Sequence, residues 1–227
     1  ERDKTYAGIK KELSPYGVCG LDFKELEADE KKYVKKCFKE QILPVLSPQI
    51  VDSSHPFPHL MNKDIYVTAN LKHINSRKNK DDKEIEQILG IVPVPTYVSD
   101  ILMLPGHDIR YIRMEKVIME YLDLVFDQYE VSDPNYICVT RNADVSPDDE
   151  ALEVTDDFRK LMQSTLHKRR RMAVVRLETA EKLTADMQEY FCKRFKITPE
   201  QIFRTKVPMK LDYMVSIAGN LPESMKK

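Results

Sequence analysis

The sequence predicts an α+β fold, in which a mixed β-sheet packs against several helices and a short helical segment precedes the sheet. Segments with the two-residue period of strands are interleaved with segments that have the 3.6-residue period of helices, as in layered domains. The first two clear strands follow each other as a hairpin. Because a hairpin is an antiparallel pair, the pattern favours a mixed sheet over a doubly wound parallel sheet.

The first sixty residues predict two helices and an extended segment. Residues 1–20 contain the last turns of a helix, which Ser14-Pro15-Tyr16-Gly17 breaks. A second helix opens at Asp29, presents one apolar face and ends at Pro44. Several prolines then keep residues 47–58 extended and rigid.

The middle of the chain predicts the hairpin and the most regular helix. Apolar side chains from Ile65 to Leu71 alternate with polar ones, which predicts a half-buried strand. Residues 75–83 form a solvated loop, and Glu84–Val92 is the return strand. After a short strand at 109–112 comes an amphipathic helix, whose apolar positions are Met114, Val117, Ile118, Tyr121, Leu122, Val125 and Phe126.

The remainder predicts alternating strands and helices. Asp133-Pro134-Asn135 forms a turn before a strand at Tyr136–Arg141, and a helix starts at Pro147. Thr184 caps another helix. The other expected elements are strands at Met172–Glu178 and Ile202–Val207 and a final helix at Leu211–Ala218.

Composition narrows the function classes only a little. The 36 basic and 37 acidic side chains give a net charge of −1, so global charge provides no argument for a nucleic-acid partner. The cysteines are far apart in the sequence and form no CxxC pair, which predicts reduced thiols and no metal site. They are Cys19, Cys37, Cys138 and Cys192. With no apolar run long enough for a bilayer and no signal peptide, we expect no membrane span and a cytoplasmic location.

Basic side chains provide the candidate binding residues. The densest run is Lys168, Arg169, Arg170 and Arg171, and Arg176 lies on the strand behind it. Such a run either interacts with the dipole at a helix C-terminus or captures a polyanion. Arg141 ends a predicted strand, where it either binds the same polyanion or is held in a salt bridge by Asp144.

His55 and His59 bracket the segment His55-Pro56-Phe57-Pro58-His59. A helix would place both on one face as metal ligands, but the two prolines forbid a helix there. The structural interpretation is that the extended segment fixes the path of the chain between the preceding helix and the first strand, with Phe57 as an anchor in the core. A histidine nucleophile here would need a base partner nearby.

Five segments in order resemble the long-chain polyphosphate kinases, bacterial enzymes that transfer the terminal phosphate of ATP to a growing polyphosphate. These segments are Lys36–Asn62, Tyr111–Phe126, Val139–Asp144, His167–Glu178 and Ile202–Asn220. The resemblance implies that residues 21–227 are the head, or middle, domain and that residues 1–20 are the tail of the preceding N-terminal helical domain.

The resemblance also implies where the chemistry lies. In that family two C-terminal domains hold the histidine that becomes phosphorylated and the Mg²⁺, and the full-length enzyme uses ATP. None of those positions is in this chain, so we expect no catalytic residue, no cofactor and no activity of the chain alone. Its expected partners are the remaining domains of the same polypeptide, a second subunit of a homodimer and polyphosphate.

A second hypothesis is a stand-alone polyanion- or RNA-binding module that uses Lys168–Arg171. The near-neutral charge and the lack of aromatic residues among these cations count against nucleic acid. An enzyme with His55 or His59 as its nucleophile is a third.

Overall fold

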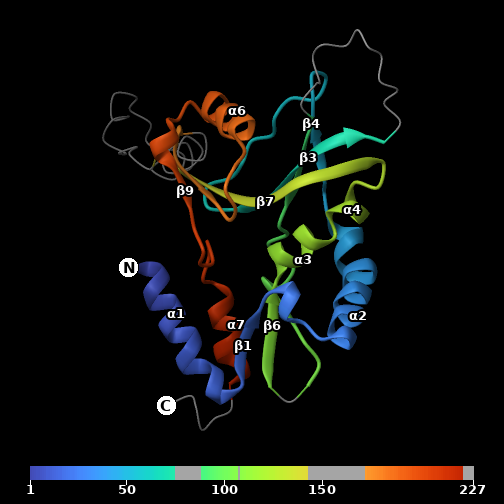
Figure 1. The fold of residues 1–227 in the computed structure, drawn as a ribbon, viewed down its shortest axis with the longest axis vertical. Helices are drawn as coiled ribbons and strands as arrows, with labels where there is room; N and C mark the ends of the chain where they lie inside the picture. The colour runs from blue at the N-terminus through green and yellow to red at the C-terminus, as the bar shows by residue number, and fades with distance from the viewer. Residues whose placement is uncertain (75–87, 107, 143–171, 222–227) are drawn as a thin grey trace, which may run out of the picture.

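The computed structural model describes residues 1–74, 88–106, 108–142 and 172–221, and in it two β-sheets follow each other along the long axis (Figure 1). The larger sheet has six strands in the order β2-β4-β3-β7-β8-β9, and the smaller has three in the order β1-β6-β5. Helices pack on both, which confirms the predicted α+β class. The strands of the larger sheet are β2 (Gln49–Val51), β3 (Ile65–His73), β4 (Ile88–Pro93), β7 (Tyr129–Arg141), β8 (Val174–Thr179) and β9 (Ile202–Arg204).

Pairing in the larger sheet is mixed, as predicted. Strand β3 is antiparallel to both β4 and β7, and β9 is parallel to β8. The predicted hairpin is confirmed as β3 and β4. Within β4, a Cβ on Gly90 would lie 2.8 Å from two ring atoms of Phe126 and 3.0 Å from Leu71. The absence of a side chain at Gly90 therefore lets this ring pack directly on the strand.

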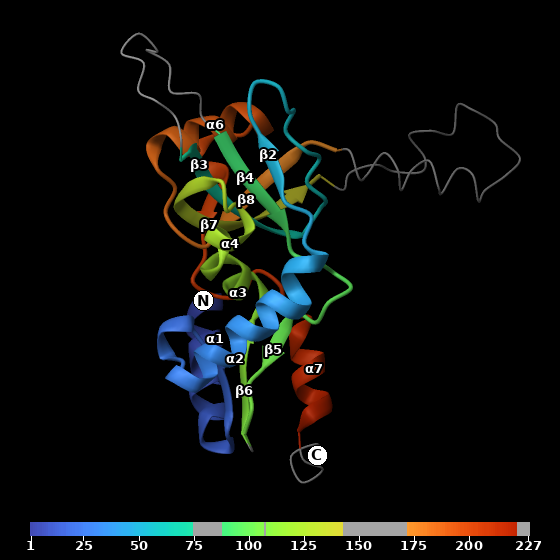
Figure 2. The ribbon, with the colours of Figure 1, turned by 90° about the vertical axis from the view of Figure 1, so that its right-hand side faces the viewer.

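The larger sheet is covered on both faces (Figure 2). One apolar cluster joins Val67 and Ala69 to α2 (Ala28–Cys37), α3 (Met114–Glu120) and α4 (Leu122–Val125). A second joins Tyr66 and neighbouring strands to α6 (Ala185–Phe195). The strand predicted at Ile65–Leu71 is confirmed as β3, but its predicted half-burial is wrong for the first residues. Tyr66 and Thr68, the polar side chains of the alternation, are 6% and 1% exposed.

Two helix predictions need correction in detail. The apolar period from Met114 to Phe126 continues across Tyr121, but the backbone leaves the helical region there, with φ −111° and ψ 27°. The result is two short helices, α3 and α4. The helix that starts at Ala28 passes into a π-helical turn at Phe38–Ile42 and then a 3₁₀ turn at Leu43–Val45. Its apolar face is buried as predicted.

Strand β7 begins at Tyr129 and runs through the predicted turn Asp133-Pro134-Asn135. The turn prediction is wrong, because these residues form an irregularity inside the strand. Asp133 has φ 49°, and the pairing register with β3 shifts between Thr68 and Asn70. Proline in a strand is tolerated at such bulges.

Of the smaller sheet, the sequence predicted only the short strand at 109–112, which is confirmed as β6. In this sheet, β1 (Val18–Leu21) is parallel to β6 (Ile109–Arg113), which is antiparallel to β5 (Ile101–Met103). Helices α1 (Arg2–Leu13) and α7 (Tyr213–Asn220) lie beside it. Helix α1 is the predicted first helix, and Gly17 ends the following turn at φ 76°. Its small core consists of Val18, Ile101, Tyr111, Tyr213 and Ile217.

The division at residue 20 between two domains stays a prediction. In the structure, Arg2 donates to Glu178 and Thr205, and the Tyr6 hydroxyl lies 3.0 Å from the Tyr213 hydroxyl. Residues 1–20 therefore contact the rest of the chain through side chains as well as through β1.

The later elements agree with the sequence. Thr184 caps α6 by accepting a hydrogen bond from the Met187 amide, and β8, β9 and α7 lie where strands and a helix were expected. The predicted loop at 75–83 and the helix from Pro147 lie outside the described residues. Among the described residues, no helix is both long and apolar enough to cross a bilayer.

Candidate functional site

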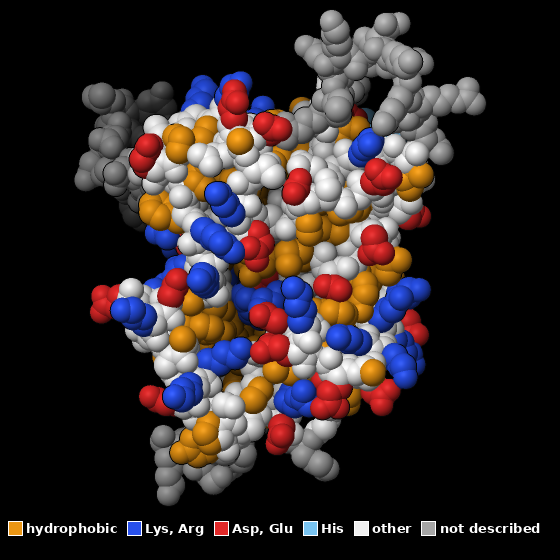
Figure 3. Space-filling model, in the orientation of Figure 1, with side chains coloured by type: hydrophobic (Ala, Val, Ile, Leu, Met, Phe, Trp, Pro, Cys, Tyr) orange, Lys and Arg blue, Asp and Glu red, His pale blue; other side chains and the backbone are white. Residues whose placement is uncertain are grey.

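Basic side chains are distributed among acidic ones on the face that Figure 3 shows, in keeping with the net charge of −1. Of the residues predicted to bind polyphosphate, Lys168, Arg169, Arg170 and Arg171 lie outside the described residues. The structure places the other two, Arg141 and Arg176, and shows what each contacts.

Arg141 ends β7 and ties three backbone segments together. Its Nε and Nη2 donate to the Leu60 carbonyl at 3.0 and 2.8 Å, and its Nη1 donates to the Met172 carbonyl at 2.7 Å. Its own amide donates to the Asn62 side chain. These bonds give Arg141 a conformational role at the end of the strand. Because a guanidinium has five N–H donors, polyphosphate binding by the remaining ones stays a prediction.

Arg176 lies on β8, and its side chain is 42% exposed. Its guanidinium stacks on the Phe203 ring at 4.5 Å and donates to Glu178 at 3.1 Å. Arg2 binds the same carboxylate oxygen at the same distance. The Glu178 carboxylate therefore already neutralises part of the positive charge of Arg2 and Arg176. A polyanion that binds Arg176 would have to compete with this carboxylate.

Arg141 and Arg176 are close in the sheet, because Thr140, the neighbour of Arg141, is paired with Arg176 between β7 and β8. Residues 168–171 come two residues before β8 in the sequence. The two side chains nevertheless face opposite sides of the sheet: Arg141 is paired with Val174, which packs in the same apolar cluster as Val139 and Leu177, whereas Arg176 alternates with Leu177 and points to the other face.

His55 has a carboxylate partner that the sequence did not reveal. The Asp52 carboxylate lies 2.9 Å from His55 Nδ1 and also accepts from the Ser54 and His55 amides. Burial acts to raise the pKa of Asp52, but the bonds from His55 and Ser54 hold it below its ordinary value. The His55 side chain is 68% exposed. These contacts describe an exposed turn that is closed by hydrogen bonds to the Asp52 side chain.

The neighbouring segment behaves as predicted. The Phe57 ring lies 5.5 Å from the Phe195 ring, and Arg194 stacks on it at 5.0 Å while donating to the Phe57 carbonyl. Phe57 therefore anchors the extended segment against α6.

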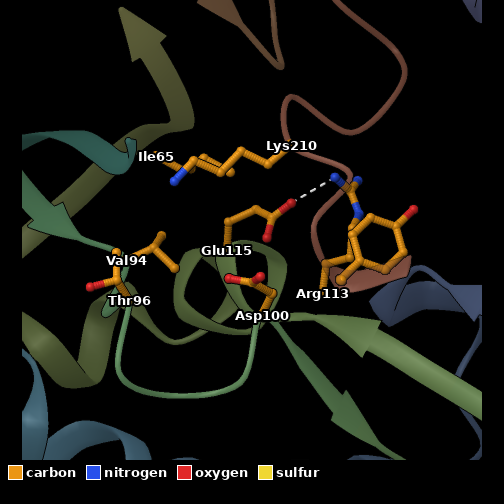
Figure 4. Close-up of a pocket in the computed structure, with 8 residues that line it drawn as sticks. Ile65, Val94, Thr96, Asp100, Arg113, Glu115 and Lys210 are labelled. Carbon is orange, nitrogen blue, oxygen red and sulfur yellow. Dashed lines mark hydrogen bonds and ion pairs between the residues drawn. The ribbon is translucent and has the colours of Figure 1, made fainter. Parts of the chain in front are cut away.

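A buried ion pair lies where the two sheets meet (Figure 4). Arg113 ends β6, and its Nη1 is 2.6 Å from the Glu115 carboxylate at the start of α3. Its Nη2 donates to the Tyr136 hydroxyl of β7 at 3.3 Å. The side chains of Arg113 and Glu115 are 9% and 6% exposed. Burial raises the pKa of Glu115, and the guanidinium of Arg113 opposes that shift.

A cavity of about 20 Å³ adjoins this pair, with Asp100 and Lys210 also on its wall. Lys210 bonds to Asp64 at 3.1 Å. The volume suits one water molecule rather than a substrate. The ion pair and the Tyr136 hydrogen bond therefore link the two sheets through buried side chains. In the sequence, Arg113 and Glu115 look like ordinary polar positions beside an amphipathic helix, and no signal marks them as a pair.

The cysteines and other possible ligands form no metal-binding group in the described part of the chain. All four cysteines are free thiols. Burial raises the pKa of the Cys138 thiol to about 11, with the nearby Glu178 carboxylate acting in the same direction. Cys138 is therefore an inert core residue rather than a nucleophile.

Comparison with known families gives the assignment. The family model of the polyphosphate kinase middle domain matches residues 29–217. The chain belongs to this family. It is 29% identical to the polyphosphate kinase of Bacillus cereus over 208 residues, which cover 90% of this chain and 29% of the relative. It is 30% identical to that of Halalkalibacterium halodurans over 212 residues, with 92% and 29% covered.

A solved structure supports the fold. The crystal structure of polyphosphate kinase from Porphyromonas gingivalis matches with a TM-score of 0.67 and 22% sequence identity, over 99% of this middle-domain chain and 31% of that protein. The chain thus spans less than a third of the relatives that it matches. The resemblance noted in the sequence is confirmed.

Proposed function

We propose that this chain is the non-catalytic head domain of an enzyme that transfers the terminal phosphate of ATP to polyphosphate through a phosphohistidine outside the chain. The observation that supports it most directly is the middle-domain match over residues 29–217, together with relatives called polyphosphate kinase that are more than three times as long. The cavity at the sheet junction is too small for ATP, the His55 side chain is 68% exposed, and burial raises the pKa of the Cys138 thiol.

The role of the domain in the parent enzyme is assembly, including contacts within a homodimer. The junction built by Arg113 and Glu115 suits this role, because a rigid link between the sheets would hold neighbouring domains at a fixed angle. Mg²⁺ and ATP would bind elsewhere in the full-length enzyme. We place that enzyme in the cytoplasm.

The test of the non-catalytic role is an assay of the purified chain with ATP and Mg²⁺ for polyphosphate synthesis, beside a full-length polyphosphate kinase as the positive control. We expect no polymer from the chain and robust synthesis by the control. Polymer formation that depends on the purified chain would refute the proposal. Loss of that synthesis in His55→Gln or in His59→Gln would then identify the third hypothesis as correct.

Guidance of polyphosphate is a second part of the proposal, supported by Arg141 and Arg176 on the neighbouring strands β7 and β8 and by the basic run at 168–171, which comes shortly before β8 in the sequence. Fluorescence anisotropy with long-chain polyphosphate at low and high salt tests it. We expect salt-sensitive binding, because neutralised phosphates release counterions, and loss of binding in the variant Arg169/Arg170/Arg171→Ala.

The charge-matched control is Lys32/Lys35/Lys36→Ala, since these three lysines are exposed on α2. It should bind as the unchanged chain does. An equal loss of polyphosphate binding in both variants would mean that binding depends only on net charge. Guidance of polyphosphate would then be withdrawn from the proposal. Binding of single-stranded RNA as tightly as polyphosphate would favour the stand-alone polyanion- or RNA-binding module.

A further inference from the structure

A groove beside α1 is far larger than the cavity at the sheet junction. Its volume is about 290 Å³, close to the size at which small-molecule sites begin. Helix α1 forms one wall, β1 and β6 form another, and residues 206–208 close it. Figure 3 shows Lys and Arg side chains around a hollow beside α1. Gly20 keeps the groove in shape, because a Cβ there would lie 2.7 Å from the Tyr111 hydroxyl.

Lysines from three separate elements line this groove. Lys10 comes from α1, Lys116 from α3 and Lys206 from the segment after β9. Arg113 also reaches the wall, but Glu115 neutralises it. Two carboxylates, Asp3 and Asp22, lie on the lining, and Asp22 contacts the Lys116 ammonium. The three lysines therefore outnumber the two carboxylates that face them.

Lys116 is the most constrained of these cations. Its side chain is 21% exposed, and burial together with the charge of Lys10 lowers its pKa to about 8. The Asp22 carboxylate acts in the opposite direction, because an opposite charge favours the ammonium. A lysine that is buried beside another lysine gains stability from a further anion. The groove is thus better suited to an anionic occupant than to water alone.

The groove also contains hydrogen-bond donors. The phenols of Tyr6 and Tyr111 lie on its wall. Burial raises the pKa of Tyr111 to about 12, so this phenol keeps its proton at neutral pH and can donate to an oxyanion. Lysines are flexible point charges and tolerate several positions of a phosphate group. A compact anion with several charges fits this combination better than a monovalent one does.

We propose that this groove, built by Lys10, Lys116 and Lys206, is a binding site for a short condensed phosphate of two or three phosphoryl groups. An anion that bridges these lysines would also join α1 to the smaller sheet. The choice of a condensed phosphate over other multivalent anions rests on the proposed function, whereas the anion site itself rests on the groove. The groove is lined by described residues of α1, β1, β6 and α3 and by residues 206–208, whereas the run at 168–171 lies outside the described residues.

Isothermal titration of the full chain with tripolyphosphate tests the site, with the variant Lys116→Met/Lys206→Met. The matched control is Lys32→Met/Lys193→Met, which removes two exposed lysines outside the groove that pair with Asp29 and Glu189. We expect one tripolyphosphate per chain, affinity at least tenfold weaker in the groove variant, and less than a twofold change in the control. Equal affinity in both variants would overturn the proposal.

Lys206 is exposed, so Lys206→Met alone provides a variant that keeps the buried Lys116 and the fold, which circular dichroism checks. It should weaken binding severalfold, and unchanged affinity would also overturn the site. Titration with citrate, a multivalent anion without phosphate, tests whether the groove selects condensed phosphates or binds any multivalent anion. Citrate as tight as tripolyphosphate would overturn the condensed-phosphate assignment, whereas selectivity for tripolyphosphate supports it. Because Arg169/Arg170/Arg171→Ala leaves the groove intact, it should keep tripolyphosphate binding even if polymer guidance fails.

Discussion

Replacing Glu115 by leucine isolates the contribution of the ion pair at the sheet junction. The change introduces an apolar side chain of similar size and removes the carboxylate 2.6 Å from Arg113. Because both side chains are at least nine-tenths buried, the guanidinium would remain in the interior with one hydrogen bond, to the Tyr136 hydroxyl. Breaking one partner of a buried pair costs about 3–5 kcal/mol.

We expect a loss near the lower end, about 3 kcal/mol, because the Tyr136 bond survives and Asp100 lines the same cavity. That loss lowers the equilibrium constant for folding by about two orders of magnitude. Urea unfolding followed by circular dichroism measures it, since the chain has no tryptophan. The double variant Arg113→Met/Glu115→Leu removes both charges and should recover to within about 1 kcal/mol of the original stability.

Two results would refute this reasoning. A cost below about 1 kcal/mol for Glu115→Leu would mean that Arg113 finds another partner or water at little cost. A double variant as unstable as the single one would mean that packing, rather than the unpaired charge, produces the loss.

Three further predictions concern the packing at Gly90, the cap of α6 and the thiol of Cys138. Gly90→Ala should cost about 1–3 kcal/mol in urea unfolding, because its Cβ would overlap Phe126; a cost near zero would show that the ring moves freely. Thr184→Ala should cost about 1 kcal/mol by removing the cap of α6, whereas Thr184→Asn, which can still cap, should cost much less. Cys138, with a pKa near 11 and 3% exposure, should resist alkylation by iodoacetamide at pH 8, where about one thiol in a thousand is ionised. Modification of native Cys138 as fast as that of a thiol in urea would contradict its burial.

The local elements could be predicted from the sequence, and the burial of their faces could not. The alternation from Ile65 to Leu71 gave the strand, but Tyr66 and Thr68 resemble solvent-facing residues in any single strand. They are buried because α6 packs on that face, and α6 begins more than a hundred residues later. The Tyr66 hydroxyl is accommodated there by accepting a hydrogen bond from the Met61 amide.

Two other differences have similar physical causes. The apolar period does not reveal the break at Tyr121, because the positions after the break still face the same core. Strands β1 and β5 have four and three residues, too few for a period to be recognised, and each is defined by its pairing with β6. Long-range pairing of this kind has no local signal.

Some of the candidate site residues could be predicted from the sequence, and others could not. Arg141 and Arg176 were found because they stand out as cations at strand positions. The groove lysines were missed, because Lys10, Lys116 and Lys206 are about a hundred residues apart in sequence and each has ordinary polar neighbours. Only the fold brings them to one cavity.

The parallel pairing of β1 with β6 has a consequence for synthesis of the chain. Val18 lies opposite Ile109, so about ninety residues must be made before β1 meets its partner. At translation rates of roughly 5–20 residues per second, β1 waits roughly 5 to 20 seconds without the strand it needs. By contrast, β3 and β4 are near neighbours in sequence and can pair as soon as both emerge. The nascent chain should therefore form the β3–β4 hairpin first and complete the smaller sheet afterwards.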